Sequence, residues 1–130
     1  MPFNTLNGLA IVVVEDHDDA RRYLDLFLSR SGANVVVARD AFEALEAIKK
    51  HRPHLVISDI QMPGKSGVEL LREIRALGPD HESTVPVIAM TGIVSPAERM
   101  RLLNAGFQAY LPKPFGPDRL LETVLAVLTK

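Results

Sequence analysis

Five short apolar runs, each followed by a segment with helical spacing, constrain the fold of this 130-residue chain more than any other feature. The runs are short and rich in β-branched residues, so we predict that they are buried strands. They lie at 9–14, 35–37, 55–57, 85–90 and 108–111. Strands that alternate with helices form parallel sheets covered by helices on both faces. The sequence therefore predicts an α/β fold with five strands and five helices in one domain.

The ends of the predicted helices carry residues that favour such ends. Ser31-Gly32 ends the first helix, because glycine suits the left-handed residue after the last turn. Asp40 is expected to cap the second helix, and Ser66 precedes the third. The run Ser95-Pro96-Ala97-Glu98 has the form of a capping box with proline at the first helical position, and the last helix begins near Pro117. Each predicted strand thus has its following helix.

The composition is typical of one globular domain. Residues 1 to 8 look like a polar leader without the features of a secretion signal, residues 9 to 130 form the predicted domain, and 80–84 is a polar loop. The formal net charge of -1 argues against direct binding to nucleic acid or to an anionic membrane surface. The absence of Cys excludes disulfides and thiolate metal sites and is compatible with a cytoplasmic location.

Polar side chains occupy four of the five junctions between a predicted strand and its helix. Glu15-Asp16 follows the first strand, Asp59 the third, Thr91 the fourth and Lys113 the fifth. All such junctions lie at the same edge of a parallel sheet, so these side chains are expected to meet in one crevice. Each alone is an ordinary turn, capping or surface residue. Together they predict a functional site.

Carboxylates crowded into one crevice raise each other's pKa values unless a cation is present. Mg2+ suits an open acidic cluster, since it binds through one or two carboxylates together with waters and phosphate oxygens. With this cofactor in place, Asp59 could act as a nucleophile toward phosphorus and form an aspartyl phosphate. Thr91 and Lys113 would then supply a hydrogen bond and a positive charge to the phosphoryl oxygens.

The chain resembles the receiver domain of two-component response regulators from Leu9 to the last helix. The resemblance rests on Glu15-Asp16, Asp59-Ile60-Gln61-Met62-Pro63-Gly64, Thr91-Gly92, Tyr110 and Lys113-Pro114-Phe115. It implies a flavodoxin-like, doubly wound five-stranded parallel sheet with strand order 2-1-3-4-5. It also implies a cis peptide bond between Lys113 and Pro114.

The resemblance implies a role for each residue of the predicted site. Asp59 would accept a phosphoryl group from a phosphohistidine on a histidine kinase or a histidine phosphotransfer protein. Mg2+ would be held by Asp16, Asp59 and the backbone carbonyl of Gln61, with Glu15 acting through water. A receiver of this kind catalyses its own phosphoryl transfer and its own slow dephosphorylation, and it does not turn over a separate substrate.

The resemblance also implies a switch. Phosphorylation adds negative charge to the site, Thr91 moves toward the phosphate and Tyr110 turns inward. This would alter the surface of the fourth helix, fifth strand and fifth helix and so control a protein partner. The first helix, with Arg21 and Arg22, is the expected docking site of the phosphodonor. The output surface is expected around Glu98, Arg101, Ala109, Tyr110 and Arg119.

Two positions tune dephosphorylation in this family, and here they carry Gln61 and Ile93. Ile93 offers no polar group, while Gln61 either orients water or faces solvent, so we predict a longer-lived phosphoryl group than in a regulator with polar residues at both positions. The segments 78–84 and 105–111 look more like receivers of hybrid histidine kinases, and a stand-alone regulator is the alternative. Since the last predicted helix reaches almost to Lys130, we expect no output domain here, and we expect a monomer or weak dimer.

Other functions fit parts of the sequence. A receiver-like scaffold or phosphate sink works by protein binding alone, but intact Asp16, Asp59, Thr91 and Lys113 argue against it. A phosphatase of the haloacid dehalogenase type also uses an Asp nucleophile, yet it has an Asp-x-Asp pair where Ile60-Gln61 follows Asp59 here. No glycine-rich nucleotide loop follows any strand. The spacing of the four histidines also argues against a histidine metal site; they are His17, His51, His54 and His81.

Overall fold

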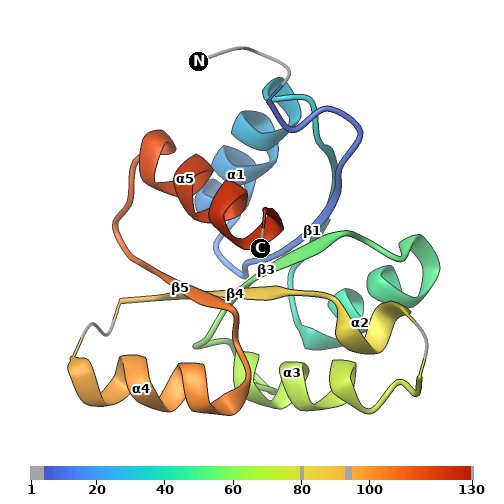
Figure 1. Ribbon diagram of the computed structural model, residues 1–130, viewed down its shortest axis with the longest axis vertical. Helices are drawn as coiled ribbons and strands as arrows, with labels where there is room; N and C mark the ends of the chain where they lie inside the picture. The colour runs from blue at the N-terminus through green and yellow to red at the C-terminus, as the bar shows by residue number, and fades with distance from the viewer. Residues whose placement is uncertain (1–4, 80, 93–94, 130) are drawn as a thin grey trace.

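The computed structural model describes residues 5–79, 81–92 and 95–129. Within these residues, five strands alternate with five α-helices, and one short 3-10 helix, η1, precedes the fourth strand (Figure 1). The strands are β1 (Ala10–Val14), β2 (Asn34–Ala38), β3 (Leu55–Asp59), β4 (Val87–Thr91) and β5 (Ala109–Pro112). The helices are α1 (Asp18–Arg30), α2 (Ala41–His51), α3 (Gly67–Arg75), α4 (Pro96–Ala105), α5 (Pro117–Leu128) and η1 (His81–Thr84). The predicted alternation is confirmed.

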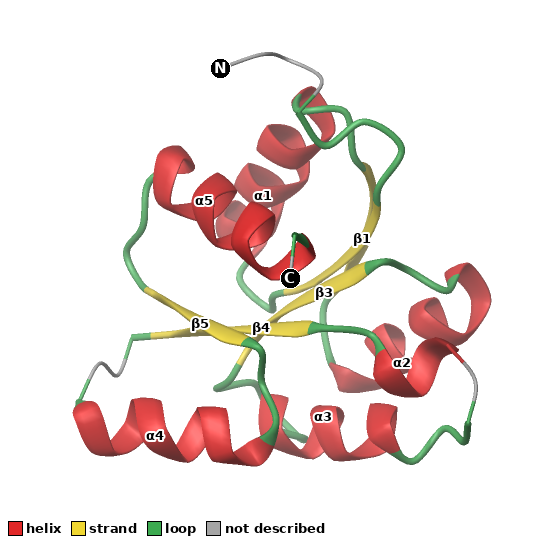
Figure 2. Ribbon diagram, in the orientation of Figure 1, coloured by secondary structure: helices red, strands yellow, loops and turns green. Residues whose placement is uncertain are grey.

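The five strands form one parallel sheet in the order β2-β1-β3-β4-β5. Val13 of β1 pairs with Val37 of β2 on one side and with Ile57 of β3 on the other. Asp59 pairs with Met90 of β4, and Thr91 pairs with Pro112 of β5. The expected flavodoxin-like order is therefore confirmed, and all strands end at the same edge of the sheet (Figure 2).

Both faces of the sheet are buried, which explains why the strands are continuous apolar runs in the sequence. In β1, Ile11 and Val13 face one hydrophobic cluster, while Val12 and Val14 face another. Helices α1 and α5 cover the first cluster, and helices α2, α3 and α4 cover the second (Figure 1). This double cover leaves the strand ends as the place where polar groups from several strands meet.

Side chains cap the starts of three helices. Asp40 accepts a hydrogen bond from the backbone N–H of Glu43 at 2.8 Å, as predicted. Ser66 and Glu69 form a complete capping box at the start of α3. At α4, Ser95 accepts from the N–H of Glu98 at 3.1 Å, but the Glu98 carboxylate pairs with Arg101. The predicted capping box at α4 is therefore present only in its serine half, because an arginine one turn along the helix engages the glutamate.

The segment before β1 requires a correction. Leu6 lies in the predicted polar leader, yet its side chain is fully buried in the cluster beneath α1 and α5. Its backbone N–H donates to the carbonyl of Ser31 at 2.8 Å. Gly32 has φ +101°, and a Cβ there would lie 2.9 Å from the Cα of Asn7. Gly32 thus ends α1 as predicted and also permits the close approach of the segment that carries Leu6 into the core.

Two boundaries near β4 differ from the predictions. Residues 81–84 form the short η1 helix, where a plain loop was expected; Asp80 lies outside the described residues. The strand itself begins at Val87, directly after Pro86. Pro86 has no N–H for the ladder, so it precedes the regular strand and contributes its carbonyl to the N–H of Val56 at 2.9 Å.

Candidate functional site

The sequence-predicted polar residues meet at the carboxyl edge of the sheet. Glu15 follows β1 and is fully buried, and Asp59 at the end of β3 is 5% exposed. Thr91 at the end of β4 is also buried, and its carbonyl accepts a hydrogen bond from the N–H of Lys113 at 2.8 Å. Parallel topology therefore brings together side chains that are up to 98 positions apart in the sequence.

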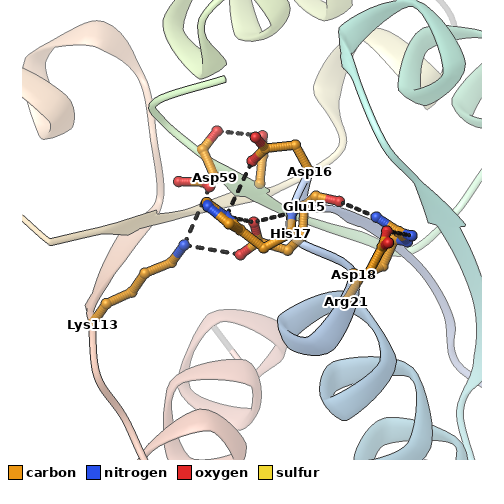
Figure 3. A network of polar contacts seen from close by, with 8 residues as sticks. Glu15, Asp16, His17, Asp18, Arg21, Asp59 and Lys113 are labelled. Carbon is orange, nitrogen blue, oxygen red and sulfur yellow. Dashed lines mark hydrogen bonds and ion pairs between the residues drawn. The ribbon is translucent and has the colours of Figure 1, made fainter. Parts of the chain in front are cut away.

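Lys113 joins the two most buried acids. Its ammonium Nζ lies 2.9 Å from Oε1 of Glu15 and 3.2 Å from Oδ2 of Asp59 (Figure 3). The expected cis peptide bond between Lys113 and Pro114 is present. One ammonium is thus shared between two carboxylates, so the buried charges do not balance.

The shared lysine shifts the pKa values of the two acids in opposite directions. Burial, followed by the charge of Glu15, raises the pKa of Asp59 to about 6 despite the opposing effect of Lys113. Burial also acts to raise the pKa of Glu15, but hydrogen bonds from Lys113 and His17 outweigh it and lower that pKa to about 2. The pKa of Lys113 is raised because its contacts with both acids outweigh its burial. Without a further cation, Asp59 is the acid that takes up a proton first.

His17 is a member of this cluster that the sequence reasoning set aside. Its ring Nδ1 lies 3.1 Å from Oε2 of Glu15 and 3.5 Å from Oδ1 of Asp16. The hydrogen bond with Glu15 raises the pKa of the His17 imidazole. Spacing among the four histidines could not reveal this residue, whereas its position directly after Glu15-Asp16 was an available signal.

Oxygen atoms in the cluster match the needs of a hard divalent cation. Asp16 Oδ1 is buried and has no hydrogen-bond partner among the described residues. One ligand atom from each of Glu15, Asp16, His17 and Asp59 lies within 4.8 Å of the other three. Mg2+ prefers carboxylate and carbonyl oxygens of this kind, so the residues fit the ion that the sequence predicts. Gln61, whose carbonyl was predicted as a further ligand, lies two residues after Asp59 with an exposed side chain.

The backbone after Asp59 depends on a glycine that sequence reasoning did not single out. A Cβ at Gly67 would lie 2.4 Å from the carbonyl oxygen of Asp59 and 3.0 Å from the Cα of Ile60. The N–H of Gly67 donates to the carbonyl of Ile60 at 2.9 Å. Only a residue without a side chain lets the start of α3 pack this closely against the loop after β3. Its place just after the Ser66 cap gave no hint of this contact.

Tyr110 lies on β5 and is half-buried. The guanidinium carbon of Arg99 on α4 lies 5.3 Å from the centre of its ring. Tyr110 also lines a hollow of about 340 Å³ with residues of α4 and α5, including Leu103 and Val127. The predicted switch residue therefore stands between the two helices of the predicted output surface. Ile93, predicted to tune dephosphorylation, lies outside the described residues.

A mostly apolar hollow of about 240 Å³ lies beside Lys113. Tyr23 of α1 and Phe115 after β5 are among its lining residues. Arg21, expected to face a phosphodonor, instead donates to the carbonyl of Glu15 at 3.0 Å and pairs with Asp18. Arg22 is exposed. Of the two predicted docking arginines, Arg21 is thus engaged within the domain, where it ties α1 to the end of β1.

Comparison with known proteins identifies the family. The sequence profile of the response regulator receiver domain matches residues 11–125. The chain therefore belongs to the response regulator receiver domains of two-component signalling. Receiver domains bind Mg2+ at an acidic site, and the cluster of Glu15, Asp16 and Asp59 is acidic. Among the described residues, none of the helices is long and apolar enough to cross a membrane.

Several relatives have this domain either alone or within a longer chain. The response regulator MprA of Mycobacterium sp. (strain KMS) is 38% identical over 120 residues, which cover 92% of this chain and 50% of that regulator. An uncharacterized 14.6 kDa protein of Leptolyngbya boryana is 40% identical over 120 residues, covering 92% of this chain and 90% of that protein. The chemotaxis response regulator CheY4 of Vibrio cholerae superimposes with a TM-score of 0.86 at 30% identity, covering 92% of this chain and 98% of the other. The chain thus spans about half the length of the MprA regulators.

Proposed function

We propose that this domain receives a phosphoryl group on Asp59 in a Mg2+-dependent reaction and uses it to control a protein partner. The observation that carries the proposal is the position of Asp59 at the centre of the site. Its carboxylate lies 3.2 Å from the Lys113 ammonium, and it belongs to a cluster with Glu15 and Asp16 that has room for a cation. A nucleophile, a cation and metal-binding oxygens are the parts that phosphoryl transfer requires.

Asp59 performs the bond-forming step. One oxygen of its carboxylate attacks the phosphorus of a phosphohistidine, and an O–P bond forms. The P–N bond breaks, its electron pair stays on the imidazole of the donor, and that imidazole takes up a proton from water. Asp59 must be ionised to attack, and its pKa of about 6 leaves it ionised at neutral pH. A histidine kinase or a histidine phosphotransfer protein supplies the phosphohistidine.

Other residues stabilise the charge that develops on the phosphoryl oxygens. Lys113 turns its ammonium from the Asp59 carboxylate to a phosphoryl oxygen, and Thr91 donates its hydroxyl to another. Asp16, Asp59 and the Gln61 carbonyl would hold Mg2+, with Glu15 acting through water. When bound, the ion would supply positive charge to the carboxylate and phosphoryl oxygens. The buried Oδ1 of Asp16, which accepts no hydrogen bond among the described residues, supports this assignment.

The output surface is formed by α4, β5 and α5. Thr91 moves toward the phosphoryl group, and Tyr110 turns inward from its position beside Arg99. Met100 and Leu103 on α4 are 60% and 40% exposed, so this helix offers apolar area to a partner. Glu98 and Arg101 on α4 and Arg119 on α5 add charged groups to this surface. The docking surface for the phosphodonor is the apolar hollow beside Lys113, together with the exposed Arg22.

Labelling with a small acyl phosphate tests the reaction. Wild-type protein incubated with acetyl phosphate and Mg2+ should gain one phosphoryl adduct by intact-mass measurement, and omission of Mg2+ should abolish it. Asp59→Asn should gain none, whereas Asp118→Asn, which changes an exposed acid at the start of α5, should label as wild type does. Equal labelling of Asp59→Asn and wild type would show that the acceptor lies elsewhere.

The lifetime of the adduct tests the roles given to Gln61 and Ile93. After removal of the donor in Mg2+, we expect the phosphoryl group to persist for minutes or longer. Introducing polar residues at both positions should shorten this lifetime. A wild-type lifetime of only seconds would contradict the proposal for these two residues while leaving the role of Asp59 intact.

A further inference from the structure

His17 directly precedes α1, and its backbone carbonyl accepts a hydrogen bond from the N–H of Arg21 at 2.9 Å. It is the N-cap residue, yet its side chain makes no capping hydrogen bond. The ring turns instead toward the acids, with Nδ1 3.1 Å from Glu15 Oε2 and 3.5 Å from Asp16 Oδ1 (Figure 3). The side chain is 72% exposed, so ions in solvent can reach it.

The positions of the donor atoms allow one ion to contact the ring and the carboxylates together. Ligand atoms of Glu15, Asp16, His17 and Asp59 lie within 4.8 Å of one another. Zn2+ binds imidazole nitrogen and carboxylate oxygen at roughly 2.0–2.2 Å with tetrahedral geometry, so two donors to one ion stand about 3.4 Å apart. The widest pair of donors must therefore approach by about 1.4 Å, and rotation of the exposed His17 ring provides much of this movement.

We propose that Nδ1 of His17 is an additional metal ligand in this receiver, which makes the site favour zinc-like divalent ions beyond what its carboxylates alone would give. The inference rests on the proposed metal site. The His17 ring adds a borderline-soft nitrogen to a set of hard carboxylate oxygens. Imidazole binds Zn2+ and similar transition ions well, whereas Mg2+ prefers oxygen and retains its waters. The ring thus changes the ion preference while the oxygens continue to serve Mg2+.

Metal titrations of His17→Phe and a matched control test this role. Isothermal titration of the metal-free protein with Zn2+ and, separately, with Mg2+ gives both affinities. His51→Phe is the control, because His51 is an exposed histidine at the end of α2. Nitrogen-15 NMR of the wild-type imidazoles provides a readout that needs no variant, since a Zn2+ bond shifts the signal of the bound ring nitrogen.

The expected result is selective. His17→Phe should weaken Zn2+ binding by about 10-fold or more and change Mg2+ binding by less than about twofold, and His51→Phe should change neither. One equivalent of Zn2+ should shift His17 Nδ1 before any other imidazole nitrogen. Equal Zn2+ affinity in His17→Phe and wild type, equal weakening of both metals, or a first shift at another histidine would overturn the inference. Failure of the wild type to bind Mg2+ would instead overturn the proposed metal site.

Discussion

At the amino edge of the sheet, Arg75 donates to the carbonyl oxygens of Ser83 at 3.2 Å and Val85 at 2.8 Å, and Gln108 Oε1 lies 3.5 Å from it. At the carboxyl edge, the single ammonium of Lys113 is shared by two buried acids. The amino edge thus matches a half-buried cation to several acceptors, and the carboxyl edge leaves buried anions with too little positive charge.

This difference separates a structural polar cluster from a functional one. Fully hydrogen-bonded buried groups stabilise a fold, whereas buried charges with incomplete partners destabilise it. Gln108 Oε1 also accepts from the N–H of Val87 at 2.7 Å, so even the amide at the amino edge is engaged in the sheet. At the carboxyl edge, in contrast, Glu15 and Asp59 share one ammonium, and the proposed cation and phosphoryl group would complete this cluster.

Removing Lys113 should lower the rate of phosphorylation more than any of the other substitutions below changes its measured property. Lys113→Met eliminates the ammonium that we propose stabilises the phosphoryl oxygens, and loss of one such donor lowers reaction rates by roughly 10²–10³-fold. Phosphorylation by acetyl phosphate, followed by intact mass against time, measures the change. Lys49→Met removes a lysine from an exposed pair with Glu46 and should leave the rate unchanged. A Lys113→Met rate within about threefold of wild type would contradict the assignment.

Neutralising Asp59 should stabilise the metal-free protein. The pKa of this acid rises from 3.8 to about 6 on folding, so its ionised form costs roughly 1–3 kcal/mol at neutral pH. Asp59→Asn keeps the shape and removes the charge, and urea unfolding in chelator should show a gain of that size. Saturating Mg2+ should reduce the difference by stabilising the wild type. A loss of stability in Asp59→Asn would mean that Lys113 already balances the acids.

Removing Arg75 should damage the amino edge without affecting the chemistry. Arg75→Met leaves buried acceptors without their donor, which should cost about 1–3 kcal/mol in urea unfolding. The rate of phosphorylation by acetyl phosphate should stay within about twofold of wild type, because the guanidinium lies at the far edge of the sheet. A selective loss of phosphorylation with unchanged stability would mean that Arg75 serves the reaction and not the fold.

Lowering the pH should stabilise the metal-free domain slightly before destabilising it. Asp59 has a raised folded-state pKa, so the native state gains protons first and stability rises by about 1 kcal/mol between roughly pH 7.5 and 5.5. Glu15 has a lowered pKa of about 2, so its contribution is lost only as the pH falls from 4.5 toward 2. The pKa of His17 is also raised by its hydrogen bond with Glu15, so protonation of His17 likewise increases stability as the pH falls. The pH dependence of the stability of His17→Phe separates the contribution of His17 from that of Asp59.

Urea unfolding across this pH range, with and without Mg2+, measures the effect. Bound cation should remove the rise, because it keeps Asp59 ionised. Asp59→Asn should also lack most of it. A rise that persists unchanged in Asp59→Asn would assign the titration to another group.

Much of the fold followed from local patterns. The alternation of apolar runs and capped helices predicted the parallel sheet, since strands buried on both faces, such as β1, need apolar residues at every position. The residues at the strand ends were predictable for the same reason, because parallel strands deliver Asp59, Thr91 and Lys113 to one edge whatever their separation in sequence. The strand order came from the family resemblance, because periodicity within each strand does not specify its neighbours.

The sequence by itself determined which chemical groups reach the carboxyl edge, through strand periodicity and the direction of a parallel sheet. Only the tertiary structure decided which of those groups contact each other and that Glu15 and Asp59 share the ammonium of Lys113. The opposite pKa shifts of Glu15 and Asp59, the turn of His17 toward the acids and the need for Gly67 beneath Asp59 all depend on distances between separate segments. Electrostatic and steric energies vary steeply with such distances, and local sequence patterns do not encode them.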